Sequence, residues 1–395
     1  MREGWEVKLL GEVSAIGAGN PAPQDRHYFE QGTIPFIRTS DVGRIHIGEI
    51  FGAADLVNEL AARKLAMLPV GTILFPKSGA STFINHRVIM GIEAVASSHL
   101  ATIKAKPHTL LDKFLFYYLL TIDAKTLVAD SNYPSLRISD IATISTPLPP
   151  LPEQRRIVAI LDEAFEGIAT AKANAEKNLQ NAHEIFESYL NAVFSQRGEG
   201  WVDRRLGDVA MEFGRGKSKH RPRNDPKLYG GNFPFIQTGD VRNSSHLITS
   251  YDQTYNDAGL AQSKLWPKGT LCITIAANIA ETGILDFDAC FPDSIIGLVA
   301  NEKISTNKYI EYLLTSFKSR LQFLGKGSAQ DNINLATFES QYFPFPPLSN
   351  QKEIVSIFDD LHEETQHLKF IYQQKLAALD ELKQSLLHQA FNGDL

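Results

Sequence analysis

The chain of 395 residues is 43% hydrophobic and 21% charged with a mean hydropathy of -0.16, which is typical of globular proteins and long enough for two or three domains. A net charge of -6 excludes a strongly positive overall field, and two cysteines, Cys272 and Cys290, without partners at metal-ligand spacing, exclude a disulfide framework and a zinc site. Apolar runs such as residues 114–120 are too short to span a membrane and residues 1–13 lack the core of a signal peptide, so we expect a cytoplasmic protein without a membrane partner.

The sequence contains an internal duplication. Residues 147–158 read PLPPLPEQRRIV and residues 344–355 read PFPPLSNQKEIV, and the two strings agree at seven of twelve positions. The phrase GW followed by LGEV at residues 4–13 returns as GW followed by LGDV at 200–209, and IPFIRTSDV at 34–42 returns as FPFIQTGDV at 233–241. These offsets of 196 to 199 residues predict two related halves, each a globular segment followed by a helix.

The first globular segment is predicted to span residues 1–150. Its basic side chains do not form one run but are scattered along the segment, at Arg26, Arg38, Arg44, Lys77 and Arg87. If this half binds a polyanion, it does so with different residues from the second half.

A long helix is predicted over residues 151–198. Between residues 153 and 196 there is no proline, and Gly167 is the only glycine. Apolar residues recur at a period of seven, in two rows that include Leu161 with Ile168 and Leu179 with Phe186, which predicts a seam for a partner helix. At about 1.5 Å per residue the helix should be roughly 60 Å long.

The second globular segment, residues 199–348, contains one dense basic stretch. Residues 214–227 read GRGKSKHRPRNDPK, in which Asp225 is the only acidic residue. Glycine and proline favour a loop, and alternating basic side chains suit contacts with phosphate groups. A solvated surface loop without a ligand is the alternative.

A second long helix is predicted over residues 349–395, with Phe358, Leu361, Leu368, Leu379 and Leu382 on its apolar seam. We expect the two seams to bury each other as a long antiparallel coiled coil, while two helices of an ordinary bundle are the alternative. The helices carry the excess of acid, since residues 151–200 have eight acidic and five basic side chains and residues 351–395 have eight and four.

The motifs tested for catalysis are incomplete. Gly216-Lys217-Ser218 matches the end of a phosphate-binding loop, but Met211 stands where that loop requires its first glycine. His362-Glu363 is followed by His367, one position too far for a zinc-protease helix. Because no nucleophile, base and orienting group come together, we expect no catalytic residues and no metal site.

The repeated phrases carry a resemblance to a known family. PPLPEQ at residues 149–154 and PPLSNQ at 346–351 each precede a long helix, and Pro-Phe-Ile recurs at 35–37 and 234–236. In this order the whole chain resembles the DNA-specificity (S) subunit of type I restriction-modification enzymes, with Asn350 where the family usually has Glu. The resemblance implies an α+β fold in which two homologous α/β target-recognition domains are separated by two long antiparallel coiled-coil helices, a pseudo-two-fold tandem repeat.

The resemblance also implies a function and partners. Each globular segment would recognise one half of an asymmetric, bipartite site in double-stranded DNA, and the helices would set the spacing. Two modification (methyltransferase) subunits would carry S-adenosylmethionine and methylate adenine, and restriction subunits would supply an ATP- and magnesium-dependent nuclease and translocase. This chain itself is expected to bind no cofactor.

The DNA-contacting residues are predicted from their position after the two Pro-Phe-Ile strands and in the neighbouring loops. They are Arg38, Thr39, Ser40, Lys77, Ser78, Asn85, His86, Arg87, Arg215, Lys217, Lys219, Arg221, Arg223, Gln237, Thr238 and Asn278. Arg, Asn and Gln make bidentate contacts with guanine or adenine, whereas Lys usually contacts phosphate. A strand-end turn or an ordinary surface charge is the alternative at each position. Two other functions stay open: a coiled-coil adaptor without sequence-specific DNA binding, and a free-standing enzyme.

Overall fold

A computed structural model describes residues 4–128, 135–276, 279–325 and 335–395. They form two compact units: the first unit is Met1–Glu176 with Gln374–Leu395, and the second unit is Lys177–Gln373. Each unit combines one globular part with one half of each long helix. This division differs from the four predicted segments, 1–150, 151–198, 199–348 and 349–395, because it passes through both helices.

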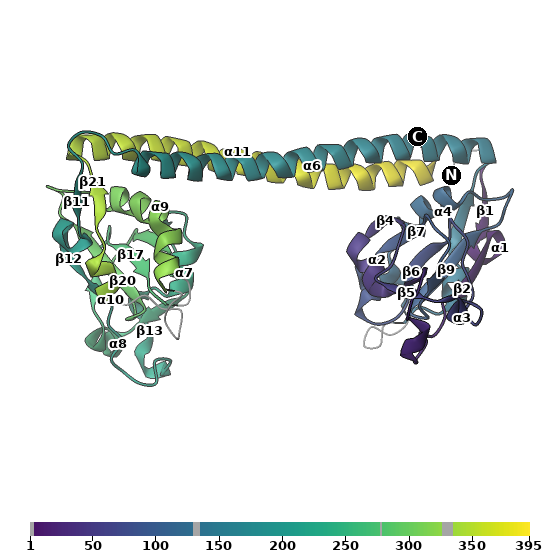
Figure 1. Ribbon diagram of the computed structural model, residues 1–395, viewed down its shortest axis with the longest axis horizontal. Coiled ribbons are helices and arrows are strands. Elements are labelled where there is room, and N and C mark those ends of the chain that lie inside the picture. The colour runs from purple at the N-terminus through teal and green to yellow at the C-terminus, as the bar shows by residue number, and fades with distance from the viewer. Residues whose placement is uncertain (1–3, 129–134, 277–278, 326–334) are drawn as a thin grey trace. The chain divides into compact units, whose positions relative to one another are not determined.

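The globular part of the first unit is built on a five-stranded sheet, a three-stranded sheet and a two-stranded ribbon (Figure 1). In spatial order the sheets are β2 (Ser14–Ala18), β9 (Leu100–Ala105), β6 (Ile73–Pro76), β7 (Arg87–Met90) and β4 (Ile47–Ile50); β5 (Asp55–Val57), β3 (Ile34–Ile37) and β8 (Val95–Ala96); and β1 (Glu6–Leu9) with β10 (Ser145–Leu148). The helices are α1 (Leu10–Val13), α2 (Thr39–Ile45), α3 (Glu59–Ala62), α4 (Asp112–Leu119) and α5 (Ile138–Ala142), with 3-10 turns η1 (Arg26–Tyr28), η2 (Ala80–Ile84) and η3 (Ala124–Leu127).

The second unit repeats this arrangement, with one additional edge strand. Its sheets are β12 (Ala210–Arg215), β20 (Ile295–Ala300), β17 (Leu271–Thr274), β18 (Thr282–Leu285) and β14 (Leu247–Ile248); β15 (Gln253–Tyr255), β13 (Tyr229–Phe235), β19 (Ala289–Cys290) and β16 (Leu265–Trp266); and β11 (Val202–Arg204) with β21 (Phe343–Phe345). The helices are α7 (Thr238–Asn243), α8 (Asp257–Gln262), α9 (Asn307–Gly325) and α10 (Leu335–Ser340), with 3-10 turns η4 (Leu206–Val209) and η5 (Pro226–Leu228). The shared strand order confirms the predicted tandem repeat.

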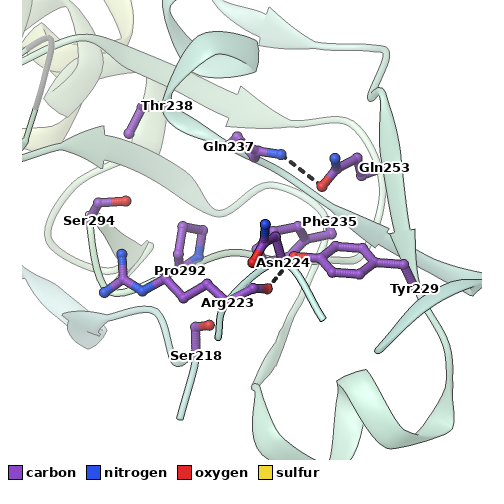
Figure 2. A pocket seen from close by; sticks show the side chains of 10 residues that line it. All are labelled: Ser218, Arg223, Asn224, Tyr229, Phe235, Gln237, Thr238, Gln253, Pro292 and Ser294. Atoms are coloured by element: carbon purple, nitrogen blue, oxygen red, sulfur yellow. Dashed lines mark hydrogen bonds between the residues drawn. The ribbon is translucent and has the colours of Figure 1, made fainter. Parts of the chain in front are cut away.

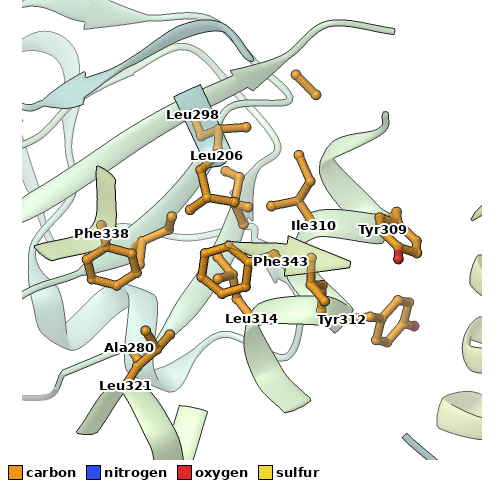
Figure 3. Packing of buried hydrophobic residues seen from close by; sticks show 14 of the residues in the cluster. Leu206, Ala280, Leu298, Tyr309, Ile310, Tyr312, Leu314, Leu321, Phe338 and Phe343 are labelled. Atoms are coloured by element: carbon orange, nitrogen blue, oxygen red, sulfur yellow. The ribbon is translucent and has the colours of Figure 1, made fainter. Parts of the chain in front are cut away.

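The central strands are apolar on both faces because each face covers a separate core. Successive side chains of a strand point to opposite faces. Ile73 of β6 lies in the core beside α4, and its neighbour Leu74 lies in the core beside α2. In the second unit Leu271 and Cys272 of β17 divide in the same way, and Figure 3 shows the larger of the two cores there.

The two long helices are confirmed as α6 (Leu151–Ser195) and α11 (Leu348–Asn392). Each has 45 residues and is therefore about 68 Å long. They pack on each other in both units. In the first unit Lys172 forms an ion pair with Asp380, and the ammonium group of Lys383 lies 5.0 Å from the centre of the Phe165 ring.

In the second unit the ring centre of Phe186 lies 6.5 Å from that of Phe358. Near the start of α6, in the first unit, Arg156 donates to the backbone oxygen of Leu395 at 2.5 Å. Within the first unit, residues 156, 165 and 172 of α6 contact residues 395, 383 and 380 in that order. The residue numbers rise on α6 and fall toward the start of α11, so the two helices are antiparallel. The prediction of an antiparallel coiled coil is therefore confirmed.

The buried row of the helix pair differs from the predicted seam at two positions. Leu161, Ile168, Phe186 and Phe358 are buried, and Leu179, Leu361 and Leu379 are partly buried. Leu368 and Leu382 are instead 41% and 46% exposed. The row on α11 passes one residue further on, through Lys369 and Lys383, which are both partly buried, and the ammonium group of Lys383 lies over the Phe165 ring.

The glutamine of each repeated Pro-Pro-Leu phrase joins a globular part to its helix. Gln154 is buried; its Nε2 donates to Thr109 O at 3.1 Å and Pro149 O at 2.9 Å, and its Oε1 accepts from Leu111 N at 2.9 Å. Gln351 is buried in the same way in the second unit. The repeat of this phrase in the sequence therefore records a repeated structural joint.

A second joint also occurs twice. Tyr117 of α4 hydrogen-bonds Asp162 of α6, and Lys113 lies 2.9 Å from the same carboxylate. On α9, Tyr312 and Lys308 contact Asp359 of α11 at 2.8 and 2.6 Å. Burial, followed by the aspartate hydrogen bond, raises the pKa of both tyrosines, so they remain neutral donors.

Candidate nucleic-acid interface

The basic stretch, defined here as residues 215–223, follows β12 along the surface of the second unit. Arg215, Lys217 and Lys219 are exposed, whereas Gly216 and Ser218 between them are buried. In an extended segment successive side chains point to opposite sides, so this alternation indicates an extended segment with one side facing solvent. The backbone passes so close to Phe291 that a Cβ on Gly216 would lie 2.2 Å from the carbonyl oxygen of Phe291, so the segment is held firmly against the fold.

The positive charge of the basic stretch is only partly neutralised. Arg223 lies 2.6 Å from Asp293, and Arg221 donates to the carbonyl oxygen of Ser218 at 2.6 Å. Arg215, Lys217 and Lys219 form no ion pair with any residue that the structure describes. These three cations are therefore available to an anionic ligand.

A cavity of about 370 Å³ brings the basic stretch together with the end of β13 (Figure 2). Gln237 and Gln253 lie on one side, with Gln237 Nε2 donating to Gln253 Oε1 at 2.8 Å, and Arg223 lies across from them. The full lining is Ser218, Arg223, Asn224, Tyr229, Phe235, Gln237, Thr238, Gln253, Pro292 and Ser294. Three predicted residues from two separate stretches, Arg223 from one and Gln237 with Thr238 from the other, thus meet at one site.

Tyr229 and Asn224 belong to this site but were not predicted. Mainly because Tyr229 is partly buried, its pKa is raised to about 12. Its hydroxyl group is therefore neutral, and it donates a hydrogen bond to Arg223 O at 2.8 Å. Gln253 was also missed. Only the pairing of β15 with β13, which places Gln253 opposite Phe235, brings it to the cavity.

The equivalent place in the first unit has different chemistry. Arg38 precedes α2, forms an ion pair with Asp55 of β5, and its guanidinium carbon lies 5.2 Å from the centre of the Phe36 ring. Thr39 is partly buried and Ser40 is exposed in the first turn of α2. These predicted residues lie at the surface, where a ligand can reach them.

Asn85, in the loop after β6, and Arg87, the first residue of β7, have a structural role that the sequence did not reveal. Arg87 is 1% exposed, lies 3.3 Å from the centre of the Phe75 ring and donates to Ile122 O at 3.1 Å. Burial lowers the pKa of Arg87 to about 9, which leaves it charged at neutral pH. Asn85 accepts from Ala124 N at 2.8 Å. The predicted surface role of Arg87 is therefore corrected: its buried side chain holds the turn before η3 against the sheet.

The other predicted residues of this region are only partly accessible. Lys77 and Ser78 are partly buried, and the backbone of Lys77 is bonded to His99 O at 3.0 Å and Leu136 N at 2.8 Å. The ring of His86 stacks on that of His46 with centres 4.5 Å apart. Burial, then the charge of His46, lowers the pKa of His86. Asn278 lies outside the described residues.

A polar joint connects the globular part of the second unit to the long helices. His246 lies 2.7 Å from Glu311 of α9 and 3.1 Å from His362 of α11, beside a cavity of about 210 Å³. Burial, then the neighbouring His246, lowers the pKa of His362 to about 4. At the positions equivalent to Glu311 and His362 the first repeat has two apolar residues, Phe116 and Phe165.

Neither a metal site nor a membrane span is found within the described ranges. No group of three or more His, Cys, Asp or Glu side chains there is placed to hold a metal ion. No helix among the same residues is long and apolar enough to cross a membrane.

A duplicated α+β fold with a long helix after each globular part, and with unlike polar side chains at equivalent surface positions, defines a tandem-repeat recognition protein. Residues 2–180 and 198–375 each match the family model of the type I restriction modification DNA specificity domain. The chain belongs to this family and contains two copies of its domain.

Curated relatives agree with this assignment, and a solved structure shares the fold. The chain is 33% identical over 194 residues to the specificity subunit of the type I restriction enzyme MjaIX of Methanocaldococcus jannaschii, a match that covers 48% of this chain and 43% of that subunit. It is 22% identical to the EcoKI specificity subunit of Escherichia coli, over 100% of this chain and 89% of the subunit. A chain from a structural study of complex assembly in the type I R-M system shares the fold, with a TM-score of 0.82, 21% identity and coverage of 100% and 99%.

Proposed function

We propose that this chain is the DNA-recognition subunit of a type I restriction-modification complex, in which each repeat binds one half of a bipartite, asymmetric site in double-stranded DNA. The observation that carries the proposal is the repeated scaffold with unlike surface side chains. The same strand and helix ends present an Arg–Asp pair in the first unit and a Gln–Gln pair in the second. Equal scaffolds with different polar groups suit recognition of two different short sequences.

The basic stretch is proposed to position the second unit on the DNA backbone. Three of its cations, which form no ion pair within the described ranges, are exposed along one extended segment, and such groups bind successive phosphates without selecting sequence. The neighbouring cavity, with its amide and guanidinium groups, is the proposed place of base contact.

The helix pair is proposed to hold the two half-sites at a constant separation. Each helix is about 68 Å long, and the two are packed on each other in both units. Half-sites on one face of B-DNA recur about every 34 Å, so a stiff spacer would select one spacing between them.

The chemistry is proposed to reside on partner subunits. Two modification subunits would carry S-adenosylmethionine and methylate adenine, and restriction subunits would use ATP and magnesium. Large apolar side chains on the helices support docking, since Ile185, Phe370 and Ile371 are 59%, 56% and 41% exposed. The chain itself is proposed to be non-catalytic, without a cofactor, and to act in the cytoplasm.

Sequencing of methylated adenines in cells with and without the chain tests the proposal. A motif of two short defined sequences, separated by a fixed number of unspecified bases, should vanish on deletion and return with the restored chain. A motif that persists without the chain would refute the proposal. Assembly with partners but no duplex binding would instead identify the chain as an adaptor.

The basic stretch is tested by its salt dependence in the assembled complex. Arg215→Ala with Lys217→Ala and Lys219→Ala removes three phosphate contacts, so the slope of log affinity against log salt should fall by about 2.7. The control removes the same charge from exposed positions of the long helices, through Lys177→Ala, Lys352→Ala and Lys375→Ala. Equal slopes in both variants would exclude the basic stretch from the interface.

A further inference from the structure

Two side-chain pairs occupy equivalent places in the two repeats. β3 and β5 place Phe36 opposite Asp55, and β13 and β15 place Phe235 opposite Gln253. Two residues after each phenylalanine, the chain enters a short helix. The residue at that entry has φ and ψ of -107° and 168° in the first repeat and of -110° and 170° in the second. The two side chains therefore leave matching backbones in the same direction, and only their chemistry differs.

The entry residue is fixed in the same way in both repeats. Asp41 accepts a hydrogen bond from Arg38 N at 2.8 Å, and Asp240 accepts one from Gln237 N at 2.7 Å. The aspartate in each copy of the repeated phrase thus holds the backbone that presents the variable side chain. The scaffold is constant, and the presented group is free to vary.

In the second repeat the presented pair is two amides. Gln237 Nε2 donates to Gln253 Oε1 at 2.8 Å beside the cavity of Figure 2. This leaves Gln237 with one carbonyl oxygen and one N–H that bond to no residue the structure describes. An acceptor and a donor side by side on one amide match N6 and N7 of adenine in the major groove.

In the first repeat the presented pair is an ion pair. Arg38 Nε donates to Asp55, and the two side chains remain 39% and 40% exposed. Neither terminal amino group of Arg38 hydrogen-bonds any residue in the described part of the chain. Two parallel N–H donors match O6 and N7 of guanine. Because Asp55 and the Phe36 ring already hold the guanidinium, less side-chain entropy is lost when the fork binds.

We propose that these two pairs determine DNA specificity: Arg38, oriented by Asp55, recognises a guanine in the first half-site, and Gln237, oriented by Gln253, recognises an adenine at the equivalent place in the second. This inference rests on the proposed function, because it requires each repeat to bind DNA. Asp55 and Gln253 act as positioning residues, through the side chains that they hold.

Contact with the DNA backbone by the same residues predicts a different outcome. Lysine binds phosphate as arginine does, but it has no planar fork to match a guanine edge. Arg38→Lys therefore separates the two modes, since a phosphate contact survives the change and base recognition does not.

The test uses the full-length chain assembled with its modification subunits in cells, and sequencing of methylated adenines as the readout. Arg38→Lys should still support methylation but accept other bases at one position of the first half-site, where methylation of the altered sites should rise about 10-fold. Arg38→Gln with Asp55→Gln reproduces the pair of the second repeat and should convert that guanine to adenine. Arg63→Gln, at an exposed arginine of the same unit, is the matched control and should change no letter.

A motif that keeps every letter in both the lysine variant and the exchange variant would overturn the inference and leave the proposed function intact. Absence of any bipartite motif with the wild-type chain would overturn the proposed function itself. If the double variant Arg38→Gln with Asp55→Gln fails to assemble, the result for Arg38→Lys alone tests the inference in the first repeat. The reciprocal double variant, Gln237→Arg with Gln253→Asp, tests the inference in the second repeat. It should change the second half-site and leave the first unchanged.

Discussion

The buried glutamine after each Pro-Pro-Leu phrase is predicted to hold its unit together. In the second unit, Gln351→Leu nearly preserves side-chain size but removes three hydrogen bonds. The amide donates to Ile304 O and Pro346 O, both at 2.9 Å, and accepts from Ser305 Oγ at 2.8 Å. Since Gln351 is 1% exposed, water cannot replace these partners.

The expected loss of stability follows from those contacts. Each hydrogen bond contributes about 1 kcal/mol net, and a buried polar group left without its partner costs about 1–3 kcal/mol. Three lost bonds, less the gain from burying an apolar side chain, predict a decrease of about 4 kcal/mol in the free energy of unfolding of the second unit. With a urea slope of about 3 kcal/mol/M, the unfolding midpoint should fall by about 1.3 M.

Urea unfolding followed by the fluorescence of Trp201 and Trp266 measures this change in the second unit. Ser356→Ala, at an exposed position of the same helix, is the control and should move the midpoint by less than about 0.3 M. A midpoint for Gln351→Leu equal to that of the control would refute the role of the glutamine. Gln154→Leu should repeat the effect in the first unit, where Trp5 reports.

Three further results are expected. Arg87→Met should lower the stability of the first unit by about 3 kcal/mol, because a buried hydrogen-bonded group is lost, and should leave the DNA affinity of the folded complex unchanged; weaker binding without a thermal shift would contradict this. His362 has a pKa of about 4 when folded, against the ordinary histidine value of 6.5, so the unfolded chain binds more protons between these values and stability falls as pH drops through that window. His362→Phe introduces the residue that the first repeat has at this position, Phe165. The decrease in the free energy of unfolding on acidification, measured by denaturation at a series of pH values, should become smaller by about 1–2 kcal/mol. An unchanged dependence of stability on pH would contradict this role of His362. A fragment ending near residue 200 should dimerise in sedimentation experiments, because Phe194 of a second copy can take the place of Phe391; a folded monomer would oppose this.

The duplication and the helices are readable from sequence because both depend on local pattern. The Pro-Pro-Leu phrases mark the two joints, and a period of seven marks the seam. The seam fails at Leu368 and Leu382, which point outward while the lysines that follow them turn inward. A lysine with a buried stem and a charged end cannot be distinguished from a surface lysine by its letter alone.

The candidate site was less predictable because tertiary pairing decides it. Arg87 reads as a loop cation, yet the ring of Phe75 and the carbonyl oxygen of Ile122 enclose it. Asp55 and Gln253 lie in short strands with no distinctive motif, and only the β-strand register places them beside Arg38 and Gln237. At the start of the basic stretch, in contrast, basic residues alternate with small ones in the sequence. The structure shows the same alternation there, because the basic side chains are exposed and the residues between them are buried.

The two joints recur at equivalent positions in each unit, so both globular parts are attached to the helices in the same way. A gene rearrangement with breakpoints at the Pro-Pro-Leu phrases would deliver an intact module with its own glutamine clamp. Such an exchange would create a new target in one event, without redesign of the scaffold. The architecture therefore favours evolution by shuffling of cassettes over gradual change at single residues.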